Sequence, residues 1–162
     1  MILLMRHGES TWNAAGRMQG QDPRPPLTER GRHQVAATAT LLAGGLLEAH
    51  PEVRVSAIVT SPARRARQSA DIVADRLGLQ VREEPLLLER GLDEPWESVE
   101  QRIRAVVTAD LSPGTLLMTH GDVVAYAAHL LAEVSVPVPA NASVIGLTPR
   151  PTPASWQLDA LC

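Results

Sequence analysis

MILLMRHGESTWN, residues 1–13, places a short apolar run directly before Arg6, His7 and Gly8. The run at residues 2–5 is continuous and does not alternate with polar residues, which is typical of a strand buried on both faces of a sheet. A buried strand has no structural need to end in a cation, an imidazole and a glycine. This ending therefore indicates a functional site at the tip of the first strand.

Two other predicted strands end in a similar way. VSAIVTS (residues 55–61) ends at Ser61, before a proline, and TLLMTH (residues 115–120) ends at His120, before Gly121. In open α/β sheets, ligands bind outside the carboxyl ends of the strands. We therefore expect polar groups from three distant parts of the chain to meet at one edge of the sheet.

Segments with helical periodicity alternate with the strands. Thr28 can cap the first helix, and two glycines at 44 and 45 end it. The four helices are expected at residues 28–43, 63–77, 97–111 and 122–134. Residues 13–27 read as a loop, residues 79–89 as a third extended stretch ending near Glu89, and residues 143–147 and 155–161 as late strands. The alternation predicts an α/β fold: a single three-layer α/β/α domain over residues 1–162, with a mostly parallel central sheet and helices on both faces.

The composition excludes several classes of protein. Apolar residues make up 44% of the 162 residues and the net charge is −3, so neither a nucleic-acid partner nor a membrane partner is expected. The single cysteine is Cys162, which rules out an internal disulfide and suits a reducing compartment. No segment resembles a signal peptide or a membrane span. These features predict a cytoplasmic location.

Arginines and histidines at the ends of strands favour phosphate chemistry. Guanidinium groups and backbone N–H groups at helix starts form anion sites that suit phosphate. A neutral imidazole in such a site can attack phosphorus, and a carboxylic acid must then protonate the leaving oxygen. Glu89, at the end of the third extended stretch, has a suitable place in the predicted topology.

Five motifs resemble those of the histidine phosphatase superfamily, the phosphoglycerate mutase-like proteins. In chain order they are LMRHGESTWN, GQDPRPPLTERGRHQ, TSPARRARQSA, MTHGDVV and NASVIGL, at residues 4–13, 20–34, 60–70, 118–124 and 141–147. Their order along nearly the whole chain makes the resemblance specific.

The resemblance implies a role for individual residues. It makes His7 the nucleophile that becomes phosphohistidine and Glu89 the proton donor, with Glu83, Glu84 and Asp93 as rival carboxylates. The residues that it assigns to the phosphoryl group and the substrate are Arg6, Arg65, His120, Asn13, Gly20 and Gly121. Arg65 is selected because it directly precedes an alanine, as in the family, whereas Arg64 and Arg67 are expected in solvent.

No cofactor and no metal are expected, because arginines beside His7, Glu9 and His120 would repel a cation. Larger family members carry a lid-like insertion after the acid, and the mutases carry a His-Tyr stretch there. Both are missing after Glu89, which predicts an open site and favours a phosphatase that hydrolyses a phosphomonoester. A mutase and a non-catalytic phosphate-binding regulatory module remain as alternatives.

The substrate is either a phosphorylated small molecule or a phosphoprotein, and the oligomeric state cannot be inferred from one chain. Trp96, just beyond the missing lid, is expected chiefly in the core, and otherwise as a cover over apolar surface beside the site.

Overall fold

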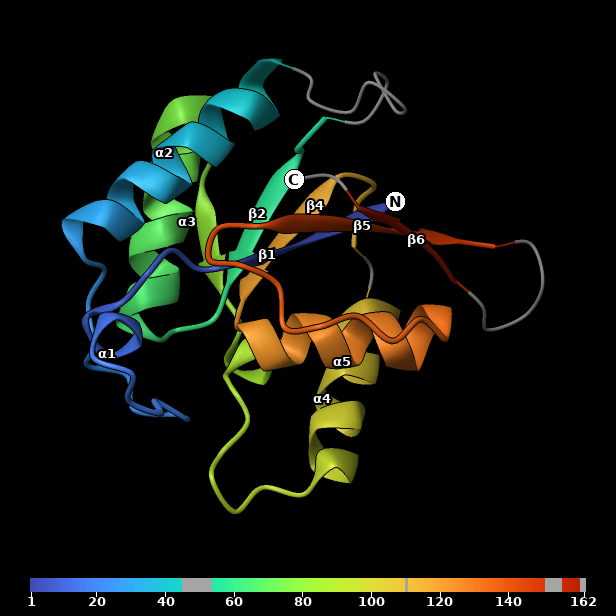
Figure 1. Cartoon of the computed structure of the whole chain (residues 1–162). Helices are drawn as coiled ribbons and strands as arrows, with labels where there is room; N and C mark the ends of the chain where they lie inside the picture. Colours follow the sequence, from blue (N-terminus) through green and yellow to red (C-terminus); the bar gives the residue numbers. More distant parts are fainter. Residues whose placement is uncertain (45–53, 110, 151–155, 161–162) are drawn as a thin grey trace.

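A computed structural model describes residues 1–44, 54–109, 111–150 and 156–160. Six strands form one sheet in the order β3-β2-β4-β1-β5-β6 (Figure 1). Their bounds are β1 Ile2–Arg6, β2 Ala57–Thr60, β3 Val81–Glu83, β4 Thr115–Thr119, β5 Val144–Pro149 and β6 Trp156–Ala160. Strands β3, β2, β4 and β1 pair in parallel, and β5 and β6 add two antiparallel pairings at one side.

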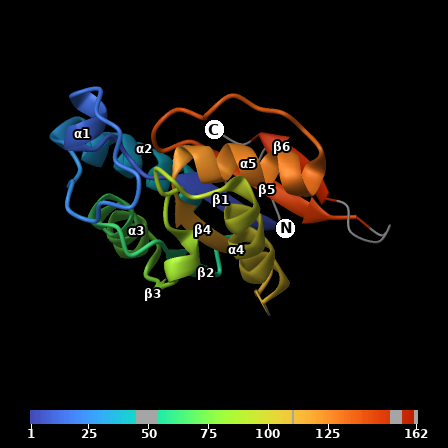
Figure 2. The same cartoon turned by 90° about the horizontal axis from the view of Figure 1, so that it is seen from below.

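Helices cover both faces of this sheet. The helices are α1 Thr11–Ala14, α2 Glu29–Gly44, α3 Arg64–Leu77, α4 Trp96–Thr108 and α5 Gly121–Ala132, with a 3-10 turn at Pro85–Leu87. Helices α2 and α3 pack on one face, and α4 and α5 pack on the other (Figure 2). The predicted α/β architecture with a mostly parallel sheet is therefore confirmed.

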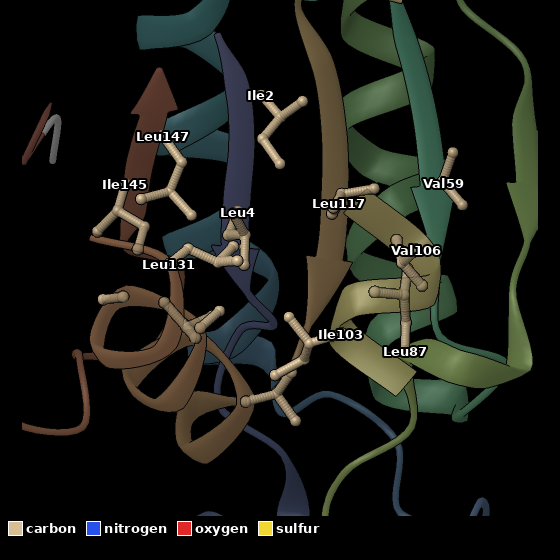
Figure 3. Close-up of a cluster of buried hydrophobic side chains, with 14 of the residues drawn as sticks. Ile2, Leu4, Val59, Leu87, Ile103, Val106, Leu117, Leu131, Ile145 and Leu147 are labelled. Carbon is tan, nitrogen blue, oxygen red and sulfur yellow. The ribbon is translucent and has the colours of Figure 1, made fainter. Parts of the chain in front are cut away.

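The alternating side chains of β1 explain why both faces are covered. Leu3 and Met5 belong to the apolar cluster under α2 and α3. Ile2 and Leu4 point the other way, into the cluster under α4 and α5 (Figure 3). Successive residues of a strand face opposite sides, so a continuous apolar run must be buried on both. Leu3, Leu4 and Met5 are at most 3% exposed.

Two local predictions were wrong. Residues 13–27 are not all loop, because the short helix α1 ends at Ala14; the Ser10 side chain caps it, in a capping box with Asn13. Residues 79–89 are not one extended stretch either. Only Val81–Glu83 is a strand, and Pro85 then begins the 3-10 turn, whose first turn is capped by the Glu84 side chain.

Some predictions lie outside the described residues, among them those on Gly45 and Cys162. The assignment of residues 1–162 to a single domain stays a prediction. In the part of the chain that is described, no helix combines the length and the apolar composition needed to cross a membrane.

Candidate functional site

The predicted site residues meet at the carboxyl edge of the parallel strands. Beyond the ends of β1 and β2, the backbone of His7 donates to the carbonyl of Thr119 (3.0 Å) and that of Ser61 donates to Met118 (2.9 Å). These bonds hold the segments after β1 and β2 against β4. His7, Ser61 and His120 therefore start from adjacent points of a rigid sheet edge.

His7 is 1% exposed, and one of its ring nitrogens is hydrogen-bonded to the backbone. Nδ1 lies 2.6 Å from the Gly8 carbonyl oxygen, which can only accept a hydrogen bond. The proton of the neutral ring therefore sits on Nδ1, and Nε2 keeps a free lone pair. Burial, with the positive charges of Arg65 and Arg6, lowers the pKa of His7 to about 3, although the bond to Gly8 opposes this shift. At neutral pH the ring is a neutral potential nucleophile.

His120 packs edge-on against His7, with 5.2 Å between the ring centroids. It is fully buried, and its Nε2 lies 2.9 Å from the Ser61 hydroxyl oxygen. Its Nδ1 has no hydrogen-bond partner among the described residues and lies 3.7 Å from Glu89 Oε2. Burial, followed by the effect of His7, lowers the pKa of His120 well below its ordinary value.

Arg65 is a fully buried guanidinium fixed by three acceptors. Its Nη1 donates to the Asp22 carbonyl (2.8 Å), and its Nη2 donates to the Gly20 carbonyl (2.9 Å) and to Glu89 Oε2 (2.6 Å). Its side chain is 0% exposed. The loop before α2 thus orients this arginine through backbone carbonyls. Arg64, by contrast, is exposed, as expected.

Arg6 reaches the site from the end of β1. Its Nη1 donates to the Pro139 carbonyl at 2.6 Å. Gly121, the first residue of α5, lies against it: a Cβ on Gly121 would come within 2.9 Å of Arg6 Nε and 2.7 Å of Val138 Cγ1. A larger residue at this position would therefore require Arg6 or Val138 to shift, which favours glycine at the helix start.

Glu89 is the predicted acid that the structure brings to the histidines. Burial raises its pKa to about 7, although Arg65 pulls in the opposite direction. The rival carboxylates have other surroundings: Glu83 pairs with Arg67 at 3.0 Å, Glu84 caps the 3-10 turn, and Asp93 is exposed. A carboxyl group with a pKa near 7 can both give and take a proton at physiological pH.

Four buried side-chain nitrogens have no hydrogen-bond partner within the described ranges, and all four lie at this site. They are Arg6 Nε, Arg65 Nε, Arg90 Nε and His120 Nδ1. Buried polar groups are nearly always hydrogen-bonded, so a cluster of free donors requires an explanation. Donors of this kind suit an anion with several oxygens, such as a phosphoryl group.

A pocket of about 140 Å³ opens beside Glu89. Its lining residues are Asn13, Arg17, Met18, Gln19, Gly20, Glu89, Arg90, Gly91, Leu92 and Asp122. Asn13 and Gly20 thus lie where a substrate contact was predicted, but each also has a structural role. The Asn13 side chain accepts from the Ser10 backbone, and the Gly20 carbonyl holds Arg65.

Arg90 belongs to the site but was not predicted as part of it. Ser61 was expected at this sheet edge only as the polar end of a strand, and its bond to His120 was not predicted. Asp122 was expected either to tune the site or to cap the next helix. Asp122 becomes a site residue only through the placement of α5, and burial raises the pKa of its carboxyl group. Trp96 is 39% exposed, so the core position expected for it was wrong. No cluster of three or more His, Cys, Asp or Glu side chains among the described residues could hold a metal ion.

Comparison of the sequence with known proteins shows the family. The family model of the histidine phosphatase superfamily (branch 1) matches residues 2–105. The probable phosphoglycerate mutase GpmB of Photorhabdus laumondii is 40% identical over 120 residues, or 70% of this chain and 51% of that protein. The GpmB protein of Cronobacter sakazakii is 30% identical over 157 residues, or 74% of this chain and 69% of that protein. The chain thus spans about half the length of the first relative.

Solved structures of other proteins have the same fold as this chain. Bacillus stearothermophilus YhfR superposes with a TM-score of 0.80 at 23% identity, covering 98% of this chain and 95% of that one. A protein described as mycobacterial hydrolase 1 superposes with a TM-score of 0.77 at 25% identity, covering 98% and 96%. With the family model matching 2–105 and the motif residues meeting at one sheet edge, the chain belongs to the histidine phosphatase superfamily, branch 1.

Proposed function

We propose that the protein is a phosphatase that hydrolyses a phosphomonoester through a phosphohistidine on His7. The observation that carries this proposal is the cluster of free buried donors on Arg6, Arg65 and His120, gathered around a neutral His7. These donors can hold the phosphoryl oxygens while the imidazole reacts. Glu89, whose pKa lies near 7, supplies the acid that the first step needs.

In the first step, the lone pair of His7 Nε2 forms a bond to phosphorus and the ester P–O bond breaks. The electron pair of that bond goes to the leaving oxygen, which takes the proton of Glu89. Arg6 and Arg65 neutralise charge on the three phosphoryl oxygens, and His120 donates a hydrogen bond to them. The ring proton on Nδ1 stays bonded to the Gly8 carbonyl and stabilises the charge that develops on the imidazole.

In the second step, Glu89 is a carboxylate and takes a proton from water. The oxygen of that water bonds to phosphorus, the P–N bond breaks, and its electron pair returns to His7 Nε2. Inorganic phosphate leaves and the protonated Glu89 is restored. One carboxyl group thus serves as acid and then as base, a use that a pKa near 7 favours.

Hydrolysis of p-nitrophenyl phosphate in the presence of EDTA tests this function. We expect turnover by the wild type and none by His7→Ala. Rapid quenching at alkaline pH, followed by mass spectrometry, should show a mass increase of one phosphoryl group on the peptide that contains His7. Full activity in His7→Ala would rule out the proposed nucleophile.

A phosphoglycerate mutase is the second candidate, favoured by similarity to the proteins called probable phosphoglycerate mutases. A mutase must retain a phosphorylated intermediate, and only residues 90–95 separate Glu89 from α4, with no room for a lid. A coupled assay with 3-phosphoglycerate and 2,3-bisphosphoglycerate distinguishes the two candidates. Isomerisation faster than phosphate release would favour the mutase.

Family membership supports a phosphorylated substrate. The choice between a phosphorylated small molecule and a phosphoprotein, and the cytoplasmic location, stay predictions from the sequence.

A further inference from the structure

The most exposed large apolar side chains gather at the mouth of the site. Among the described residues, the three highest exposures belong to Met18 at 80%, Leu92 at 66% and Val138 at 57%. Single exposed apolar residues are ordinary on a protein surface, but a group beside a pocket marks a binding region. The three come from three separate loops, so no single amphipathic element accounts for them.

Contacts place each of these side chains next to the proposed phosphoryl site. Met18 and Leu92 line the pocket that contains Glu89. Leu92 also lies over the loop that orients Arg65, since a Cβ on Gly20 would be 3.6 Å from Leu92 Cγ. Val138 covers the start of α5, 2.7 Å from where a Cβ on Gly121 would be.

Tryptophan rings extend this surface. Trp96 stacks on Tyr126, with 4.5 Å between ring centroids, and the Arg90 guanidinium lies 4.9 Å from the Trp96 ring. Arg17, which also lines the pocket, lies 4.0 Å from the ring of Trp12. Both pocket arginines thus lie against aromatic rings, which hold their flat faces in place.

The charged side chains of the pocket are of both signs, so they do not select for a second charged group on the substrate. Glu89 and Asp122 both line the pocket, so two carboxyl groups lie beside the path of the leaving alcohol. Asp122 accepts a hydrogen bond from the Val123 backbone at 2.8 Å, which fixes it at the start of α5. Arg17 and Arg90 line the same pocket, so the preference for an uncharged group rests on the exposed apolar side chains at its mouth.

We infer that Met18, Leu92, Val138 and Trp96 form an apolar subsite for the leaving alcohol. The preferred substrate is then a phosphomonoester of an uncharged, apolar alcohol, either aromatic or long-chain. This inference rests on the proposed phosphatase function and adds the substrate class to it. The short connection at residues 90–95 leaves the subsite open, so the length of the alcohol is not limited by a lid.

The test compares alkyl phosphates that share one leaving-group chemistry. Hexyl phosphate and ethyl phosphate both release a primary alkoxide, and they differ only in apolar length. We expect kcat/KM to be at least about tenfold higher for hexyl phosphate, because each buried methylene adds binding energy. 3-Phosphoglycerate, which offers no apolar chain to the subsite, should be turned over no better than ethyl phosphate.

Substitutions in the proposed subsite test which side chains cause the preference for hexyl phosphate over ethyl phosphate. Leu92→Gln and Met18→Gln should each reduce the hexyl-to-ethyl ratio several-fold. Leu41→Gln is the matched control, since Leu41 is 48% exposed on α2 and is not among the pocket residues. It should leave the ratio unchanged. Equal ratios in Leu92→Gln, Met18→Gln and wild type would overturn the subsite, as would a preference for 3-phosphoglycerate.

Binding of non-hydrolysable phosphonates separates this inference from the proposed function. Calorimetry with hexylphosphonate and ethylphosphonate requires no turnover. Tighter binding of hexylphosphonate that Leu92→Gln removes supports the subsite, even if no ester is hydrolysed and the phosphatase proposal fails. Hydrolysis of all esters with equal affinity for both phosphonates contradicts the subsite and leaves the phosphatase proposal standing.

Discussion

Burial acts in the same way on His7 and Glu89, and it shifts their pKa values in opposite directions. Burial disfavours charge on both, so the imidazole stays neutral down to low pH and the carboxyl group keeps its proton up to about pH 7. A neutral base beside a protonated acid is the state needed to begin attack on a phosphate ester. Desolvation of the two side chains therefore prepares the chemistry before a substrate binds.

Glu89 should control the pH dependence of hydrolysis. Its pKa is raised, so the acid form is present below about pH 7 and is lost above it. For an alkyl phosphate, we expect kcat/KM to fall above pH 7, while p-nitrophenyl phosphate, whose alcohol leaves without a proton, falls much less. Glu89→Gln should slow the alkyl ester by about 10²–10⁴-fold, measured as phosphate release.

Two results would contradict this role. If Glu89→Gln matched the wild type on the alkyl ester, another carboxylate, such as Asp122, would be the acid. If neither protein turned over any ester but both bound phosphate, the non-catalytic binding module would be favoured.

Ser61 should determine which nitrogen of His120 carries the proton. Its oxygen already accepts from the Ala63 backbone at 3.3 Å, and His120 Nδ1 faces a Glu89 oxygen. We therefore expect the hydroxyl to donate to Nε2, which leaves an Nδ1–H directed at the phosphoryl site. Imidazole ¹⁵N NMR should report the Nδ1–H tautomer in the wild type and a mixture in Ser61→Ala.

Activity gives a second measure of this role. Ser61→Ala should lower kcat about tenfold and also cost about 1–3 kcal/mol of stability, because it leaves a buried nitrogen unsatisfied. Ser61→Thr keeps the hydroxyl and should restore both the tautomer and the rate. An unchanged ¹⁵N spectrum in Ser61→Ala would show that Ser61 has no part in setting the tautomer.

At the scale of elements, the segment after β1 crosses the start of α2 at very short range. A Cβ on Gly31 would lie 2.1 Å from the Glu9 carbonyl oxygen, and one on Gly8 would lie 2.4 Å from the Gly31 oxygen. Both clashes are with backbone, which cannot rotate away. The Thr28 N–H donates to the Glu9 carbonyl oxygen at 2.9 Å, and this bond joins the two segments at the same crossing. This contact sets the position of His7 relative to α2.

Gly31→Ala should therefore reduce the free energy of unfolding by about 3 kcal/mol, measured by urea denaturation. Gly44→Ala on the same helix is the matched control, because no atom lies within 4 Å of a Cβ there. It should leave stability unchanged or raise it by at most about 1 kcal/mol. Equal effects of the two substitutions would mean that the crossing is not tightly packed.

At the scale of the whole molecule, the buried groups of the site make the free energy of unfolding depend on pH. His7 is neutral when folded and would take a proton near pH 6.5 when unfolded, so it destabilises the protein as pH falls from 6.5 towards 3. Glu89 acts in the opposite sense. Its folded pKa of about 7 exceeds its ordinary 4.5, so protonation stabilises the folded state as pH falls from 7 to 4.5.

Without the Glu89 carboxyl, the loss of folding stability that the buried histidines cause at low pH should become larger. Relative to wild type, Glu89→Gln should lose additional stability, up to about 1.4 kcal/mol for each pH unit, between pH 7 and 4.5. Urea denaturation at several pH values measures the difference. Parallel pH profiles for the two proteins would show that the Glu89 carboxyl is not protonated in the folded state in this range.

The sequence by itself predicted the α/β class, because apolar runs that are buried on both faces and segments of helical periodicity are local patterns. Its five motifs indicated the family by resemblance, and that resemblance selected the residues expected to hold phosphate. Capping and 3-10 geometry near Asn13 and Glu89 were missed, because short turns depend on individual side-chain hydrogen bonds and not on periodicity.

Only the tertiary structure decided that Glu89, and not Glu83 or Glu84, lies beside the histidines. It also brought Asp122, Ser61 and the exposed apolar side chains to the same edge of the sheet. These residues are far apart in the chain, and their closeness follows from strand order and helix packing. The pKa values of His7 and Glu89 are set by burial, a property of the assembled fold that no single segment contains.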